Sequence, residues 1–172
     1  MPKEFLPLVE TEIKIRNAEE KDFLDIMSIA GNCEPMPVER DSIYHDLTRY
    51  FTNTCFIAER EGKIVGYLLG WISQIDSTVA YIHNVCVVPG MRRRQVATGL
   101  YNGFFETVEA TGCNRIFLIV SPRNKISLDF HRALGFEISK EGEGIEIEGV
   151  RAVRDYNGPE KHMVVMCRQI RA

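Results

Sequence analysis

An apolar run, residues 78–88, leads into a basic turn and then into an amphipathic segment, and this order limits the folds open to the chain. The run has apolar residues at both parities, so both faces of the strand that it forms should be covered, as in a central strand with helices around it. Leu100, Phe104 and Val108 follow at helical spacing, and Gly112 can end that helix in the left-handed conformation that glycine tolerates. The order of strand, basic turn and helix predicts an α/β fold.

Hydrophobic periodicity predicts further strands and helices on both sides of this unit. Ile13 and Ile15 alternate with charged residues, which is typical of a half-buried strand, and Phe23, Ile26 and Met27 recur at helical spacing. Helices are expected from about residues 19 and 40, after the basic turn, and after residue 124, and the last two strands are joined by a long segment rich in turn residues. The predicted strands are residues 11–16, 55–59, 63–73, 78–88, 115–120, 136–140 and 162–168.

Length, composition and charge bound the class of protein. A chain of 172 residues with 45% apolar and 26% charged residues is typical of one globular domain, and we expect a single domain, 1–172, with its core at about 11–170. The net charge of -3 favours neither nucleic acid nor an anionic membrane as a partner, because both attract basic surfaces. No run approaches the ~20 apolar residues that a membrane helix needs.

The cysteines and histidines predict the compartment and exclude a metal. The five cysteines are Cys33, Cys55, Cys86, Cys113 and Cys167. Their number is odd, their spacing is wide and no C-x-x-C pair is present, so we expect reduced, mostly buried thiols. Together with the lack of a signal-peptide pattern at the start of the chain, this indicates the cytoplasm. The four histidines have no metal-ligand spacing, and no metal site is expected.

The basic turn suggests the first chemistry. The free N–H groups and partial positive charge at the start of the following helix suit a phosphate or pyrophosphate. Arg92, Arg93 and Arg94 add side chains that pair with phosphate oxygens bidentately. On composition alone, a solvated basic turn is an equal alternative. An RNA-binding module is disfavoured, because no aromatic platform or extended basic face accompanies the arginines.

Two motifs resemble those of the GNAT superfamily of N-acetyltransferases, and the resemblance covers nearly the whole chain. The first, Val-x-Pro-x-x-Arg-x-x-Gly-x-Gly/Ala, is matched by Val87, Pro89, Arg92 and Ala97, with Gln95 at the place of its first glycine. The second, Asn-x-x-Ala/Ser followed by aromatic residues and Gly-Phe, is matched by Asn124, Ser127, Phe130, Gly135 and Phe136. Both motifs in register, with one helix and one strand between them, make a fairly specific signal.

The resemblance implies a single mixed sheet of about seven strands with about four helices, which splays apart to admit acetyl-CoA as co-substrate. The pantetheine arm would bond to the main chain of Val85, Cys86 and Val87. The pyrophosphate would be held by Arg92, Arg93, Arg94, Gln95, Val96, Ala97 and Thr98. Asn124 would contact the cofactor from the other side of the splay, although the same residue is also a good helix N-cap. Gln95 adds a Cβ where glycine permits φ > 0, so it either weakens the site or donates from its amide.

Two histidines are the candidate catalytic residues. An alkyl amine has a pKa near ~10.4 and must lose a proton before it attacks a thioester. His83 is the leading candidate base, because imidazole titrates near ~6.5 and serotonin N-acetyltransferase, a family member, has a histidine at this place. His131 holds the place of the tyrosine with which many family members protonate the departing thiolate; an imidazolium, a water or a nearby tyrosine would serve instead. Each histidine also has a purely structural interpretation.

The predicted function is acetyl-CoA-dependent transfer of an acetyl group directly to a primary amine of a small molecule or peptide. The alternative is a non-catalytic acyl-CoA-binding or sensing module, favoured by Gln95 and by the missing tyrosine. Ile119 stands where acetyltransferases of the bacterial ribosomal type place a glutamate base, which disfavours a ribosomal-protein acceptor. Acceptor contacts are expected from the 31–40 linker, where Glu34 and Glu39 are either solvated or attract an amine, and from the 141–161 segment. The family resemblance is also compatible with a homodimer.

Overall fold

The structure, a computed structural model, describes residues 12–33 and 38–170. One mixed sheet has the strand order β1-β2-β3-β4-β5-β9-β6, and β7 pairs with β8 in a separate hairpin. The strands are β1 Lys14–Asn17, β2 Phe56–Arg60, β3 Lys63–Ile72, β4 Val79–Val87, β5 Arg115–Val120, β6 Glu137–Ile138, β7 Gly144–Ile147, β8 Val150–Val153 and β9 Val164–Gln169. The α-helices are α1 Phe23–Ala30, α2 Asp41–Tyr50, α3 Val96–Ala110 and α4 Lys125–Ala133. The predicted α/β fold, with about seven strands and four helices, is confirmed.

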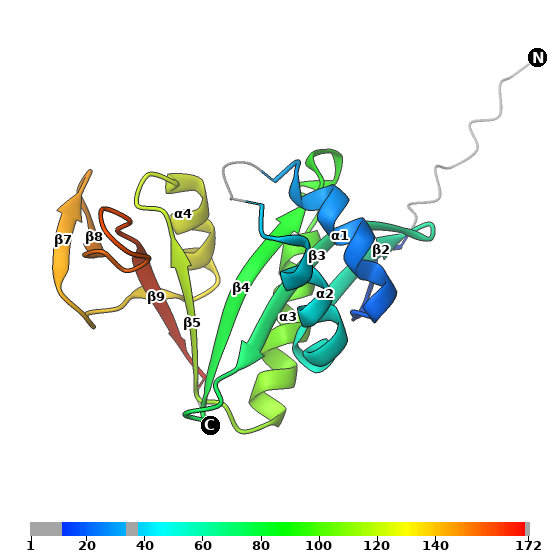
Figure 1. The fold of residues 1–172 in the computed structure, drawn as a ribbon, viewed down its shortest axis with the longest axis horizontal. Coiled ribbons are helices and arrows are strands. Elements are labelled where there is room, and N and C mark those ends of the chain that lie inside the picture. Colours follow the sequence, from blue (N-terminus) through cyan, green and yellow to red (C-terminus); the bar gives the residue numbers. More distant parts are fainter. Residues whose placement is uncertain (1–11, 34–37, 171–172) are drawn as a thin grey trace, which may run out of the picture.

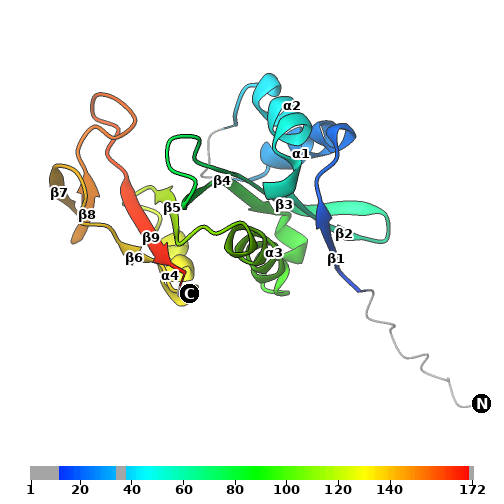
Figure 2. The same ribbon diagram turned by 90° about the horizontal axis from the view of Figure 1, so that it is seen from below.

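Helices cover both faces of the sheet, with α1 and α2 on one face and α3 on the other (Figure 2). The core on the α3 side is built around Phe104, and the core on the α1 and α2 side around Tyr44. β4 contributes to both cores, through Ile82 on the first side and Cys86 on the second. This confirms the expectation drawn from the apolar residues at both parities of 78–88. No helix of the described part has the length and apolarity needed to cross a membrane.

A bulge in β4 explains how one strand serves both cores. Leu69 of β3 pairs with Asn84, and the next residue, Gly70, pairs with Ile82, so His83 is an extra residue in β4. Such a bulge bends the strand and turns its side chains to new directions. Gly70 lies against this point, where a Cβ would meet a carbonyl oxygen of β4 at 2.6 Å. The bulge therefore leaves His83 without a pairing partner on β3.

The sheet splays apart between β4 and β5, as the resemblance implied. The two strands are parallel, but their pairing covers only Val79↔Arg115, Ala80↔Ile116 and Tyr81↔Phe117. Beyond these pairs β4 and β5 diverge toward the top of the molecule (Figure 1). On its far side β5 pairs with β9 over its whole length. The result is a sheet in two parts that are joined at one end and open at the other.

The segment that joins the last two strands of the sheet contains a hairpin that the sequence pattern did not predict. β7 and β8 pair antiparallel, with Ile147 opposite Val150. The two residues between them have positive φ, 51° at Glu148 and 79° at Gly149, as a two-residue hairpin turn requires. Glutamate is a poor signal for such a turn, which usually has Asn, Asp or Gly at that place. The expected single long connection is therefore corrected to a hairpin followed by the turn-rich residues 154–162.

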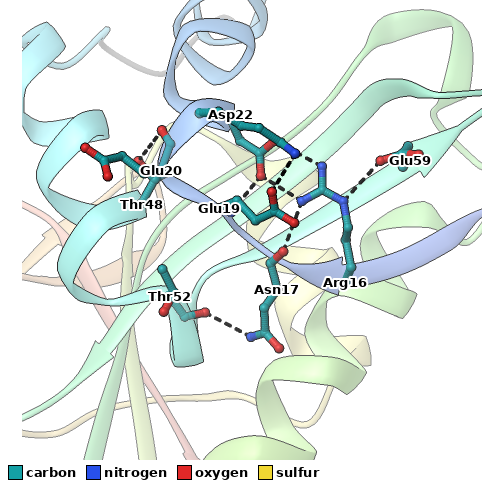
Figure 3. Close-up of polar contacts among 9 residues, drawn as sticks. Arg16, Asn17, Glu19, Glu20, Asp22, Thr48, Thr52 and Glu59 are labelled. Atoms are coloured by element: carbon teal, nitrogen blue, oxygen red, sulfur yellow. Dashed lines mark hydrogen bonds and ion pairs between the residues drawn. The ribbon is translucent and has the colours of Figure 1, made fainter.

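A partly buried ion-pair cluster ties the residue before α1 to the edge of the sheet (Figure 3). The Arg16 guanidinium donates to both oxygens of Asp22, at 2.7 and 3.0 Å, and to Glu59 of β2 at 3.0 Å. Burial alone would raise the pKa of Asp22, but hydrogen bonds from Arg16 and from the Glu19 amide outweigh it and leave that pKa lowered. Asp22 is therefore an ionised carboxylate at 3% exposure, and it needs its partners to remain so.

The expectation of five reduced thiols is wrong for two of them. Cys33, directly after α1, forms a disulfide with Cys86 of β4, with the two Cα atoms 5.9 Å apart. Cys55 and Cys113 are buried free thiols and Cys167 is partly buried, as expected. The disulfide requires the Cys86 side chain to point toward α1. It does so because the bulge at His83 changes which face of the sheet the following residues of β4 point to. Two cysteines separated by 53 residues carry no local signal of such a contact.

Candidate active site

A cavity of about 1060 Å³ lies between the diverging strands. Among its lining residues are four that the sequence predicted as site residues, namely His83, Val85, Asn124 and His131. Both segments expected to contact an acceptor reach it as well: the 31–40 linker contributes Glu39, and the 141–161 segment contributes Glu141 and Tyr156. Glu34 lies outside the described residues. Residues of β4 and residues at the start and inside of α4, about 40 positions later in the sequence, thus line one cavity.

His83 presents its imidazole to this cavity from the bulge of β4. Its Nε2 lies 3.1 Å from Oε1 of Glu39, and 25% of its side chain is exposed. The ring packs against Trp71, with 5.1 Å between the ring centroids. Trp71 in turn packs against Tyr81 at the same separation. His83 is therefore oriented by a carboxylate and an aromatic wall, yet it stays accessible to a molecule in the cavity.

Asn84 lies beside His83 and is held by a chain of buried hydroxyls. The Tyr67 hydroxyl donates to Asn84 Oδ1 at 3.1 Å, and Tyr67 is itself hydrogen-bonded to Tyr44. The Tyr44 hydroxyl accepts the main-chain N–H of Glu39 at 3.0 Å. Burial raises the pKa of both phenols, so both keep their protons at neutral pH. This chain connects the linker to β4 and fixes Glu39 and His83 relative to each other.

His131 lines the cavity from α4 and has both ring nitrogens occupied. Nδ1 lies 2.7 Å from the carbonyl oxygen of Ser127, which can only accept, so Nδ1 carries the proton. Nε2 then accepts a hydrogen bond from the Tyr101 hydroxyl at 2.6 Å. Burial lowers the pKa of His131 and raises the pKa of Tyr101. At neutral pH this is a neutral imidazole bonded to a protonated phenol, and no imidazolium is present.

Asn124 has the structural role that its residue type suggested. It is the N-cap of α4, and its Oδ1 accepts the main-chain N–H of Ser127 at 3.1 Å. The same residue also lines the cavity. Position therefore permits both of the roles considered for Asn124, as helix cap and as a contact for a bound molecule.

The basic turn lies at the end of β4 that is open in the splay, next to the start of α3 (Figure 1). The side chains of Arg92, Arg93 and Arg94 are exposed, and Arg92 Nε donates to the carbonyl of Val87 at 3.2 Å. Within the described residues, the first main-chain hydrogen bond into α3 comes from Gly99, so the amides of 96–98 have no main-chain acceptor there. Three guanidinium groups and a helix start with free amides can hold an anion.

Gln95 adopts the conformation that the glycine of the motif would permit. Its φ is 60°, and Arg93 two residues earlier has a φ of 62°. Such left-handed backbone costs a residue with a side chain about 1–2 kcal/mol. The turn therefore keeps the shape implied by the motif in spite of the glutamine, and it holds that shape at a cost in stability.

The other predicted cofactor residues do not line the cavity through their side chains. The Cys86 side chain faces α1, and Val87 packs against the core on the α3 side. The role predicted for them used the main chain. On the side of β4 that faces β5, the main chain of residues 85–87 has no strand partner, because the pairing with β5 ends at Tyr81. The turn and the cavity are thus successive parts of one path along β4.

Sequence reasoning did not single out three residues that organise the site. Glu39 was weighed only as a solvated or amine-attracting carboxylate, while Asn84 and Tyr101 were not considered. No local pattern identifies them, because each gains its role from a partner on another element. Within the described residues, no group of three or more histidine, cysteine, aspartate or glutamate side chains is placed to hold a metal ion.

Comparison with known proteins relates this geometry to a family. The Acetyltransferase (GNAT) family matches residues 16–136 of the chain. An uncharacterized N-acetyltransferase of Methanocaldococcus jannaschii is 37% identical over 86 residues, which is 48% of this chain and 38% of that protein. A putative [ribosomal protein bS18]-alanine N-acetyltransferase of Bacillus subtilis is 23% identical over 129 residues, covering 75% of this chain and 83% of that protein.

A solved structure with the same architecture is the diaminobutyrate acetyltransferase of Paenibacillus lautus, in complex with L-2,4-diaminobutyric acid and coenzyme A. It superposes with a TM-score of 0.76 and 22% identity, covering 92% of this chain and 95% of that one. At this identity the likeness concerns the fold. This likeness covers more of the chain than the family match to residues 16–136.

Proposed function

Because the chain belongs to the GNAT family of acetyltransferases, we propose that it transfers an acetyl group from acetyl-CoA directly to a primary amine of a small molecule or peptide. The observation that carries this proposal is the cavity at the splay, with the Glu39–His83 pair on its β4 wall. One path along β4 leads from that pair to the basic turn. The whole domain, residues 1–172, acts as one unit that receives both substrates.

The residues on this path fit acetyl-CoA. The pyrophosphate is assigned to Arg92, Arg93, Arg94, Gln95, Val96, Ala97 and Thr98, whose free amides and guanidinium groups match its charge. The main chain of Val85, Cys86 and Val87 offers hydrogen bonds to the pantetheine arm along the open edge of β4. Asn124, which lines the cavity at the start of α4, would contact this arm. When bound, acetyl-CoA supplies the activated acetyl group.

His83 is the proposed base. The acceptor amine enters protonated and must lose a proton to attack the thioester. His83 is exposed to the cavity and can take that proton directly or through one water. Glu39, 3.1 Å from its Nε2, orients the ring and offsets the positive charge that the ring acquires.

His131 and Tyr101 are proposed to assist departure of the thiolate. A neutral imidazole whose Nδ1 proton is bound to Ser127 has no proton to give. The Tyr101 hydroxyl has one proton, which it donates to His131 Nε2 in this structure, so it becomes the donor to the sulfur when its O–H rotates away from that nitrogen. Burial raises the pKa of Tyr101, which makes it a hydrogen-bond donor to the sulfur and not a full acid. His131 is then a positioning residue that holds this hydroxyl at the cavity.

Binding and catalysis are tested separately. Acetyl-CoA at 100-fold over its Kd should stabilise the fold by about 2.7 kcal/mol, measured by thermal unfolding. Glutamine at Arg92, Arg93 and Arg94 together should remove most of this shift, whereas Lys21→Gln, an exposed cation beside α1, should not. No shift in the unaltered protein would overturn the cofactor assignment.

Release of coenzyme A thiol against a panel of amines tests the transfer itself. The panel contains amino acids, polyamines, aminoglycosides and peptides with free N-termini. Release with any of them, abolished by His83→Gln, supports the enzyme. The alternative, a non-catalytic acyl-CoA sensor, is favoured by the strained Gln95 and by the neutral His131. It requires stabilisation by acetyl-CoA without release from any amine.

We also propose a cytoplasmic location and a homodimer. Acetyl-CoA as donor supports the first, and family resemblance supports the second. A disulfide is unusual in a reducing compartment, so the thiol count of protein isolated under alkylating conditions tests the location. Light scattering of the purified chain gives the oligomeric state, and a monomeric mass overturns the dimer.

A further inference from the structure

The charged side chains that line the cavity, histidines aside, are all carboxylates. Among the described residues that line it, the charged side chains other than histidine are Glu39 and Glu141, and no lysine or arginine is present. Glu39 faces His83 on the β4 wall, and Glu141 comes from the segment that follows β6. Carboxylates on two walls favour a cationic molecule and disfavour an anionic one.

Two arginines on the segments next to the cavity are engaged elsewhere. Arg151 donates to main-chain carbonyls of the preceding segment, including Ser139 and Gly142 at 2.9 Å each. Arg154 is paired with Glu143 at 2.9 Å. The three arginines of the basic turn do not line the cavity either. Among the described residues, no guanidinium or ammonium group therefore belongs to the cavity lining itself.

The uncharged walls also suit a cation. Trp71, Tyr81 and His83 form a run of packed rings along β3 and β4, with 5.1 Å between neighbouring centroids. Tyr156 adds a further ring from the 141–161 segment. Aromatic faces attract alkylammonium groups and give nothing comparable to a carboxylate.

Resting on the proposed function, we propose that the acceptor is an aliphatic amine that carries a second positive charge and no carboxylate. The reacting amine lies against the Glu39–His83 pair, where it loses its proton to His83. The second ammonium group remains protonated and is paired with Glu141. A substrate such as L-2,4-diaminobutyric acid, named for the Paenibacillus lautus enzyme, carries a carboxylate that this cavity leaves unpaired.

The test compares three amines that share one carbon chain. 1,3-Diaminopropane is L-2,4-diaminobutyric acid without its carboxylate, and 2,4-diaminobutyramide keeps the size but not the negative charge. We expect kcat/KM to be at least about tenfold higher for the diamine and for the amide than for the acid, because a like charge placed beside a carboxylate costs affinity. Equal or higher kcat/KM for the acid overturns the proposal.

Variants assign the effect to the cavity. Glu141→Gln should lower the preference for the diamine, and Glu141→Arg should raise kcat/KM for the acid. Glu143→Gln, a neighbouring carboxylate that pairs with Arg154 and does not line the cavity, should change neither. A free tripeptide amide is the fourth acceptor; if it is used better than the diamine, the requirement for a second ammonium group is wrong.

Calorimetric binding separates this proposal from the proposed function. Titration of the protein with coenzyme A present should give a lower Kd for 1,3-diaminopropane than for L-2,4-diaminobutyric acid. Selective binding of the diamine without acetylation supports the acceptor class and overturns the enzyme. Acetylation with no discrimination between the diamine and the acid supports the enzyme and overturns the acceptor class.

Discussion

His83 and His131 line the same cavity from different walls, and their surroundings differ. On the β4 wall, His83 has one carboxylate partner and a quarter of its side chain exposed. On the α4 wall, His131 is 8% exposed and both nitrogens are bonded, to Ser127 and Tyr101. Two residues of the same type therefore have different surroundings in one cavity. One imidazole is open to exchange a proton with a ligand, and the other is closed by its neighbours.

Removal of each imidazole in turn should affect catalysis to different extents. His83→Gln should lower kcat by roughly 10²–10⁴-fold, the usual contribution of a general base, with little change in acetyl-CoA binding. His131→Gln should lower kcat less, because a glutamine amide can still accept from Tyr101. Steady-state release of coenzyme A thiol measures both.

His45→Gln is the matched control for these variants. His45 is an exposed histidine of α2, paired with Glu20 at 2.8 Å and outside the cavity lining. It should leave kcat unchanged. An enzyme that keeps more than a tenth of its kcat after His83→Gln has its base elsewhere.

The β4 wall is also tied covalently to α1, and the α4 wall is not. Reduction of the Cys33–Cys86 disulfide should lower the free energy of unfolding by about 2–4 kcal/mol, because the unfolded chain regains the freedom that the closed loop removed. Urea denaturation with and without dithiothreitol measures this loss. In the double variant Cys33→Ala and Cys86→Ala, dithiothreitol should not change the free energy of unfolding. If dithiothreitol also leaves that free energy unchanged in the unaltered protein, the disulfide is contradicted.

The closed environment of His131 predicts a pH dependence of stability. Burial lowers its pKa below the ~6.5 of the unfolded chain. As pH falls below about 6.5, the unfolded state binds a proton that the folded state refuses, so stability falls until the folded pKa is reached. Chemical denaturation between pH 7.5 and 5 measures this slope.

His131→Gln should reduce that slope. Carboxylates of lowered pKa, such as Asp22, are protonated only below the pH range of this experiment. Their protonation therefore destabilises the protein at lower pH and does not contribute to the slope measured here. A slope that is the same in the protein with and without His131 would show that another group titrates.

The smallest effect concerns the basic turn, which neither wall includes. Gln95→Gly should stabilise the fold by about 0.5–1 kcal/mol, because glycine adopts positive φ without the penalty of a Cβ. Acetyl-CoA should bind at least as tightly. Arg93→Gly, at the neighbouring left-handed position, is the control that relieves the same strain but removes a cation. A large loss of affinity in Gln95→Gly would identify the glutamine amide as a ligand.

The sequence predicted most elements because their signals are local. The apolar run of 78–88 became β4, and the motif at residue 124 became a cap with its side chain on Ser127. The β7–β8 hairpin was not predicted, because Glu148 has positive φ at a turn position where Asn, Asp or Gly is usual. The state of Cys33 and Cys86 was predicted wrongly, because spacing along the chain says nothing about two side chains that meet across a sheet and a helix.

The order of strand, basic turn and helix proposed to bind the cofactor could be read from the sequence alone, as could the two histidines that reach the cavity. Only the tertiary structure decided how they differ. Glu39 reaches His83, and Tyr101 reaches His131 across 30 residues, through contacts between separate elements. The charge and accessibility of a side chain depend on such neighbours, and neighbours that are distant in the chain are brought together by packing alone.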